Sequence, residues 1–185
     1  NLLEARINVL EKSLMNSLSV SLYSDGTGSS GKEVGGLQLI VADAGTGTVG
    51  GINSSTYTFW QNAQTTATSS AFSVANVQSD MNTIYLSLVR GADSPDLVMA
   101  GTNAYTAFLG SLQAIQRITS DDMARSGFTS LQYLNSDVVF DSAANTNRMY
   151  FLNTDYLRLE VAASRDFVPG EAKMSVNQDA MVTPM

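Results

Sequence analysis

The sequence contains no cysteine and no histidine. Without cysteine, the chain has no disulfide, no thiolate nucleophile and no sulfur ligand for a metal ion. Without histidine, it lacks the commonest general base and the commonest metal ligand. Most familiar catalytic and metal-binding arrangements are therefore excluded. We assign no catalytic residue, no cofactor-binding residue, no metal ligand and no cofactor.

Positive charge is also scarce. Charged residues make up 15% of the chain, the formal net charge is −7, and no lysine or arginine occurs between residues 34 and 89. A dedicated nucleic-acid-binding domain needs a basic face, so we expect no sequence-specific nucleic-acid recognition. No apolar run reaches the length of about 18 residues that a membrane span needs, so we expect no membrane partner.

The first 23 residues show the clearest periodic pattern. Apolar residues recur every three or four positions, which predicts one long amphipathic helix over residues 2–23. A Gly/Ser-rich stretch follows it. The pattern begins at the first residue without a cap or an initiator methionine, so we expect the sequence to be a fragment of a longer chain. The residues of this helical stripe are Leu3, Ile7, Leu10, Leu14, Leu18 and Leu22.

The middle of the chain predicts a layered α/β arrangement. A helix is expected over residues 74–90, with Ser73 as its N-cap and Gly91 as its C′ residue. A short buried strand, Leu97–Ala100, leads into a third helix. The side chains expected to face inward from that third helix are Tyr105, Phe108, Leu109, Leu112 and Ile115.

The remainder of the chain is expected to be mainly strand. Strands are predicted where β-forming residues cluster between turn signals, and where Leu157, Leu159 and Val161 alternate with charged residues. The order of helix, loops, α/β layer and strands predicts an α+β class. The predicted strands cover residues 128–133, 138–140, 149–152, 156–161 and 173–182.

Residues Gly45–Gly50 spell G-x-G-x-x-G after an apolar run, Leu37–Ala42, which is predicted as a strand. This is the dinucleotide-binding fingerprint, but its context fails in three respects. The residues that follow are poor helix formers, no acidic residue stands about 20 positions further on, and no basic residue lies nearby. We therefore predict a turn in which Gly45, Gly47 or Gly50 has positive φ or approaches other backbone closely.

Two acidic pairs could supply paired carboxylates, Asp121–Asp122 and Asp93 with Asp96. Both stand beside Ser, Gly or Pro at predicted helix ends or turns, where aspartate is a common turn former. A metal site would need further ligands nearby, and the sequence offers no such cluster. We interpret both pairs as turn residues. A serine–lysine dyad would have to use a lysine without a recognisable signature around it, namely Lys12, Lys32 or Lys173.

The single tryptophan, Trp60, stands beside Phe59. We interpret this pair as a core or interface anchor rather than as a ligand platform. Four arginines lie between predicted turns, and the sequence leaves two interpretations open for them: solvated or internally paired side chains, or contacts between subunits. They are Arg117, Arg125, Arg148 and Arg165.

A series of phrases then extends along nearly the whole chain: GGLQLIVAD (35–43), GTGTVGGI (45–52), TYTFWQN (56–62), SLQAIQR (111–117), GFTSL (127–131), DVVFD (137–141), MYFLNTDY (149–156) and SVNQDAMV (175–182). In content and order they resemble the major capsid proteins of tailed bacteriophages, which have the Hong Kong 97-like shell fold. The resemblance implies a fold with a long spine helix in a peripheral domain and a mixed α/β axial domain.

The resemblance also implies a domain organisation. Residues 1–34 would form the spine helix and linker of the peripheral domain, residues 35–165 the axial domain, and residues 166–185 a strand that returns to the peripheral domain. The N-terminal arm and extended loop of the family would precede Asn1, and their absence agrees with the expectation of a fragment.

The function that the resemblance implies is that of a non-enzymatic structural subunit. Copies would self-assemble into an icosahedral capsid that encloses DNA without sequence-specific binding. The subunit would be located in the virion capsid after assembly in the host cytoplasm. Its partners would be other copies of itself, and scaffold, portal or decoration proteins. The alternatives are an encapsulin-type cellular nanocompartment shell protein, a nucleotide-binding enzyme that uses Gly45–Gly50, and an adhesin-like secreted module.

Overall fold

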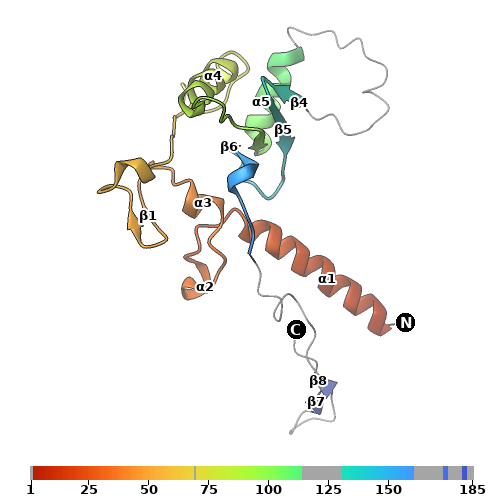
Figure 1. Ribbon diagram of the computed structural model, residues 1–185. Helices are drawn as coiled ribbons and strands as arrows, with labels where there is room; N and C mark the ends of the chain where they lie inside the picture. Colours follow the sequence, from red (N-terminus) through yellow and green to blue (C-terminus); the bar gives the residue numbers. More distant parts are fainter. Residues whose placement is uncertain (1, 69, 114–130, 161–172, 175–180, 183–185) are drawn as a thin grey trace. The chain divides into compact units, whose positions relative to one another are not determined.

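A computed structural model describes residues 2–68, 70–113, 131–160, 173–174 and 181–182 (Figure 1). The chain forms two compact units, residues 1–154 and residues 155–185. The first unit contains a four-stranded mixed sheet with its helices. In the second unit, β7 (Lys173–Met174) pairs with β8 (Met181–Val182) as a short antiparallel ladder. The α+β class predicted from the sequence is confirmed.

The main sheet is built around β3 (Leu97–Ala100). Its strand order is β4 (Leu131–Tyr133), β5 (Ser136–Phe140), β3 and β6 (Met149–Leu152). β3 runs parallel to β5 and antiparallel to β6, and β4 and β5 form an antiparallel hairpin. The sheet therefore mixes both pairing types, which is characteristic of an α+β arrangement.

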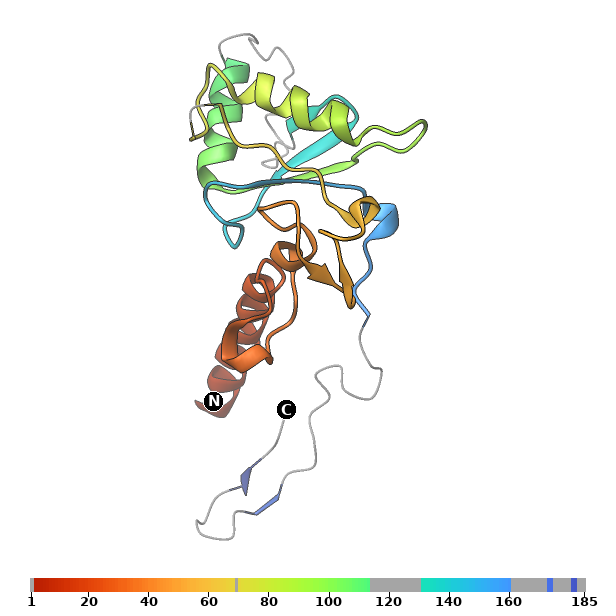
Figure 2. The ribbon, with the colours of Figure 1, turned by 90° about the vertical axis from the view of Figure 1, so that its left-hand side faces the viewer.

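One face of the sheet is covered by two helices, α4 (Val77–Leu88) and α5 (Thr102–Gln113). Val98 has Val138 beside it on β5 and Phe151 beside it on β6, so an apolar row crosses the sheet on this face. Figure 2 shows both helices on one side of the strands. The buried residues of this first core are Val77, Met81, Val98, Ala100, Ala104, Ala107, Phe108, Leu131 and Val138.

The opposite face carries a second, smaller core. Tyr23, Ala144, Tyr150 and Leu152 are its buried residues. Partly buried side chains from α3 (Leu37–Ile40) and the residues after it pack against them. The orange segment that contains α3 lies on the side of the strands opposite α4 and α5 in Figure 2. The sheet is thus covered on both faces, by regular helices on one side and mostly by loops on the other.

The long N-terminal helix is confirmed as α1 (Leu2–Ser21), which has 20 residues. Much of its apolar surface faces solvent: Ile7 is 40% exposed and Leu10 is 47% exposed. Beyond it, α2 (Gly28–Gly31) is a single turn in which Ser29 and Ser30 have positive φ. Tyr23, at the end of the helical pattern, belongs to the second core.

Several boundaries differ from those predicted. The helix predicted over residues 74–90 extends over Val77–Leu88, and Asn76 rather than Ser73 is the residue that precedes it. Gly91 has φ +64 in a tight turn closed by backbone hydrogen bonds between Arg90 and Asp93, so it is not the C′ residue. Ile115 and residues 128–130 lie outside the described residues.

The strand predicted over Leu37–Ala42 is wrong, because Leu37–Ile40 form one helical turn, α3. The cause is tertiary: the backbone N–H groups of Gly36 and Leu37 donate to carbonyl oxygens of Ser24 and Leu22, which fixes this segment to the end of α1. An ideal Cβ on Gly36 would lie 2.3 Å from the Leu22 oxygen, so only glycine permits this close approach.

Two C-terminal predictions also need correction. Residues 157–160 belong to no strand, although a strand was predicted over 156–161; residue 161 lies outside the described residues. The single strand predicted over 173–182 is instead two short strands, β7 and β8, which pair with each other. The alternation of apolar and polar residues at 157–160 is thus not sufficient to produce a strand there, because β-propensity depends strongly on context.

We predict that Phe108→Ala lowers the free energy of unfolding by about 3–5 kcal/mol, because it leaves a cavity in the first core. Phe108 is 1% exposed. Urea denaturation followed by circular dichroism measures the change. Leu86→Ala on α4 is the matched control, since Leu86 is 73% exposed. If Phe108→Ala lowered the free energy of unfolding as little as Leu86→Ala does, the assignment of this core would be contradicted.

Candidate functional site

The glycine-rich motif forms a hairpin. β1 (Thr48–Val49) pairs with β2 (Ile52–Asn53), and the two residues between them, Gly50 and Gly51, have φ of +60 and +80. Two consecutive positive φ values are typical of the tight turns that suit β-hairpins, and glycine adopts them most readily. The predicted turn is confirmed. A strand rather than a helix follows Gly50, so the strand–turn–helix geometry of the dinucleotide fingerprint is missing here.

The base of this hairpin is held together tightly. Gly45 has φ +69, and an ideal Cβ there would lie 3.4 Å from the backbone oxygen of Asn62. The buried Ser54 hydroxyl accepts a hydrogen bond from the Gly47 N–H at 2.8 Å and donates to the Gly47 oxygen at 3.0 Å. Gly47 itself has no positive φ. The segment is therefore an ordered loop, fixed by its own backbone.

An aromatic loop follows the hairpin. In the short 3-10 helix η1 (Thr58–Trp60), Phe59 is 77% exposed and Trp60 is 47% exposed. The ring centroids of Tyr57 and Phe59 lie 6.0 Å apart in an edge-to-face arrangement. Placement of Trp60 and Phe59 in a core, one of the two interpretations of the sequence, is therefore wrong for this chain alone. The interface-anchor interpretation stays a prediction.

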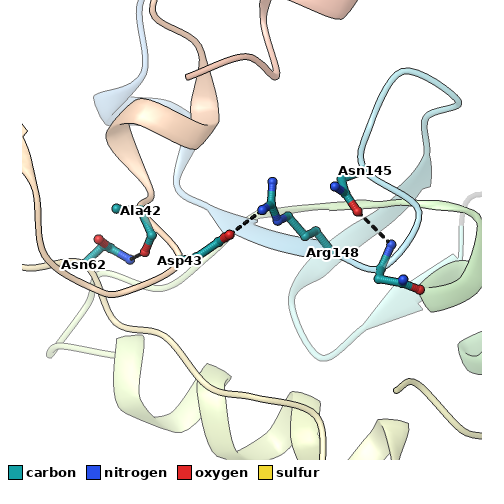
Figure 3. Close-up of polar contacts among 6 residues, drawn as sticks. Ala42, Asp43, Asn62, Asn145 and Arg148 are labelled. Carbon is teal, nitrogen blue, oxygen red and sulfur yellow. Dashed lines mark hydrogen bonds and ion pairs between the residues drawn. The ribbon is translucent and has the colours of Figure 1, made fainter. Parts of the chain in front are cut away.

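An ion pair joins the glycine-rich region to the sheet (Figure 3). Arg148, directly before β6, pairs with Asp43, two residues beyond the cap of α3. Beside it, the Asn62 amide donates to the Ala42 carbonyl oxygen at 3.0 Å. Arg148 is 22% exposed and Asp43 is 60% exposed, so the pair is only partly screened by solvent. Of the two interpretations of Arg148, internal pairing is the one observed.

A tyrosine–aspartate contact anchors the end of α1. The Tyr23 hydroxyl donates a hydrogen bond to the Asp141 carboxylate at 2.7 Å. The ring centroids of Tyr23 and Tyr150 lie 6.1 Å apart. Burial, reinforced by Asp141, raises the pKa of the Tyr23 phenol well above its usual value. Asp141 also accepts a hydrogen bond from the Ala143 N–H, so one carboxylate fixes both the turn after β5 and the helix terminus.

The acidic pair Asp93 and Asp96 does not form a carboxylate pair with a shared role. Asp93 closes the turn with Arg90. Asp96 accepts hydrogen bonds from the hydroxyl and the N–H of Thr154, which lower the pKa of its carboxyl group. Asp93 is a turn residue, as interpreted from the sequence, whereas the same interpretation is wrong for Asp96, which directly precedes β3 and holds Thr154.

Of the remaining sequence candidates, those in the described residues form no further chemical site. Lys12 and Lys32 are exposed, on α1 and after α2. Within the described ranges, no group of three acidic residues is placed to hold a metal ion, and no helix has the length and apolar character needed to cross a bilayer. Asp121, Asp122, Arg117, Arg125 and Arg165 lie outside the described residues.

A cavity of about 590 Å³ lies beside β6, and no sequence pattern predicted it. Its walls come from residues 41–43, from residues 61–67 and 70–72, from α4 and from β6. A volume of this size is within the usual range of small-molecule sites. We call it the β6 cavity. Its residues come from four separate parts of the sequence, so no local pattern could have indicated it.

The exposed apolar surface is the other candidate. Exposed large apolar side chains lie on α1, on the aromatic loop and on several other described segments. Such exposure on several elements is typical of a protein with interaction surfaces. The members on α1 and the residue after it are Ile7, Val9, Leu10, Met15, Val20 and Leu22.

Comparisons with protein-family models, with characterised proteins and with solved structures found no match for this chain.

We predict that Tyr23→Phe lowers the free energy of unfolding by about 2 kcal/mol at neutral pH, because a partly buried hydrogen bond to a carboxylate is lost. The raised pKa means that the folded state favours the neutral phenol. The wild-type stability associated with Tyr23 is therefore complete below pH of about 10 and falls as the pH rises further.

The variant should accordingly lose less stability than the wild type between pH of about 9 and 11. Urea titrations across this range measure it. Tyr57→Phe, at a ring that is 52% exposed, is the control and should follow the wild-type profile. If the free energy of unfolding changed equally with pH in Tyr23→Phe and the wild type, the role assigned to this contact would be contradicted.

Proposed function

We propose that the chain is a structural subunit of a tailed-bacteriophage-type capsid with the Hong Kong 97-like shell fold. The observation that carries the proposal is the ordered series of sequence phrases between residues 35 and 182 that resembles this family. A chance match to any one phrase would say little. The common order of phrases along most of the chain is the specific feature.

The exposed face of α1 supports this proposal. A helix of 20 residues with apolar side chains such as Leu10 in solvent is only marginally stable by itself. Neighbouring subunits in a shell would cover this face and stabilise the helix. In the proposal, residues 1–34 are the spine helix and its linker, residues 35–165 the axial domain, and residues 166–185 a returning strand.

The composition supports a container rather than a DNA-binding protein. With a net charge of −7, the subunit would enclose DNA without binding it in a sequence-specific manner. The partners in this proposal are other copies of the chain, together with scaffold, portal or decoration proteins. The location is the virion capsid, after assembly in the host cytoplasm, and the role is not enzymatic.

Electron microscopy of the complete reading frame that encodes this sequence tests the proposal. The protein would be expressed with the adjacent genes for any scaffold and protease. We expect closed icosahedral shells. Only unassembled subunits under these conditions would contradict the proposal, and closed shells that carry a cargo enzyme in place of a genome would favour the encapsulin-type alternative.

We predict that Leu10→Glu abolishes shell formation, because it places a charge on the apolar stripe of α1. Leu10 is 47% exposed, so the isolated subunit should change in stability by no more than about 0.5 kcal/mol. Asn16→Glu is the matched control, since helical periodicity places residue 16 opposite the stripe. Electron microscopy and size exclusion compare the variants. Normal shells from Leu10→Glu would show that this face is not an assembly contact.

A further inference from the structure

The β6 cavity lies along the edge of the main sheet. Its lining includes five consecutive residues, Asn147, Arg148, Met149, Tyr150 and Phe151. Successive side chains of a strand point to opposite faces, and Met149 and Phe151 do pack on the first core while Tyr150 belongs to the second. A cavity that contacts all five must therefore follow the backbone edge of β6, the strand that ends the described sheet.

The register of β6 determines which backbone groups face this cavity. The Gly101 N–H donates to the Arg148 oxygen at 3.0 Å, so the backbone groups of Arg148 are directed toward β3. The direction alternates along an antiparallel strand, so Tyr150 shares the orientation of Arg148. The N–H and C=O groups of Met149 and Phe151 consequently point away from β3, toward the cavity. Such groups are a template for another strand.

The walls of the cavity suit an amphipathic strand. On the side of the first core, Phe72, Ile84 and Leu88 offer apolar surface. On the other side, the ion pair of Asp43 and Arg148 offers both signs of charge. A strand that occupies the cavity would therefore bury apolar side chains on one face and present charged ones on the other.

The chain itself contains such a segment. Residues 157–160, Leu-Arg-Leu-Glu, alternate as a half-exposed strand does, yet they belong to no strand. Leu157 is 36% exposed and Leu159 is 61% exposed. This segment thus has one largely exposed apolar side chain, Leu159, and one partly exposed one, Leu157, while the β6 edge has backbone groups directed into a cavity.

We propose that residues 157–160 of a second copy of this chain add to the edge of β6 as a further strand. Leu157 and Leu159 pack against the apolar wall formed by α4, and Arg158 and Glu160 face the charged side. This is peptide recognition by β-strand addition, in which main-chain hydrogen bonds give affinity and alternate side chains give specificity. This inference rests on the proposed function in one respect: it assumes that copies of the chain assemble, and it names one contact between them.

A synthetic peptide tests the proposal on the full chain. The probe is residues 155–160, acetylated, amidated and labelled with fluorescein, and its binding to the protein is followed by fluorescence anisotropy. Two further peptides carry N-methyl groups, one on the amides of residues 157 and 159, the other on those of 158 and 160. A strand uses alternate amides for pairing on one edge, so we expect exactly one of the two to bind at least about tenfold more weakly.

Two protein variants accompany the peptides. Leu88→Asp on the cavity wall should weaken binding of the unmodified peptide at least about tenfold, whereas Leu86→Asp on the exposed side of α4 should leave it unchanged. Leu86 is 73% exposed and does not line the cavity. Circular dichroism verifies that each variant is folded. The methylated peptides need no change in the protein, so they decide the question even if Leu88→Asp does not fold.

The outcomes separate this inference from the proposed function. No binding of the unmodified peptide, or equal binding of both methylated peptides, would overturn strand addition at β6, whether or not shells form. Selective loss with one methylated peptide would support it even if the complete reading frame gave no shells, and in that case only the proposed function would be contradicted.

Discussion

The packing of both faces of β3 is the constraint on which the rest of the structure depends. Val98 and Ala100 are fully buried beneath α4 and α5, while Met99 contributes to the second core on the other face. A strand that is buried on both sides needs a layer on each. The helices provide one layer in the regular way, and a glycine-rich segment together with the end of α1 provides the other.

That second layer explains several unusual local features. The close approach at Gly36 fixes α3 to the end of α1. The ion pair of Arg148 with Asp43 and the hydrogen bond from Tyr23 to Asp141 fix irregular backbone against the sheet. Loops carry polar backbone groups that must be satisfied, so their docking requires specific side chains rather than a general apolar face. Within the described residues, much of the apolar surface of α1 remains exposed, and the proposed function assigns its cover to other subunits.

The sequence predicted those parts of the fold that depend on local periodicity. The α1 stripe, the α4–β3–α5 succession and strand β6 were found because their apolar residues repeat at helical or strand spacing. The failures occurred where distant residues decide. Leu37–Ile40 are helical because Gly36 docks on the end of α1, and residues 157–160 show strand alternation but belong to no strand of the described chain.

The candidate sites follow the same division. The turn at Gly50 and Gly51 could be predicted because positive φ is a local property of glycine. The β6 cavity could not, since its walls meet only after the sheet and α4 have packed. The exposure of Phe59 and Trp60 could not be predicted from the sequence either. An aromatic residue favours burial, but the sequence does not say whether the same chain or another molecule covers it.

Hydrogen–deuterium exchange of the α1 amides tests the central claim, that this helix is an assembly surface, most directly. The measurement compares dissociated subunits with assembled particles of the complete protein. We expect fast exchange along α1 in the dissociated subunit and strong protection in the particle, with little change in α5, whose core is already formed within one chain. Equal exchange of α1 in both states would contradict the account.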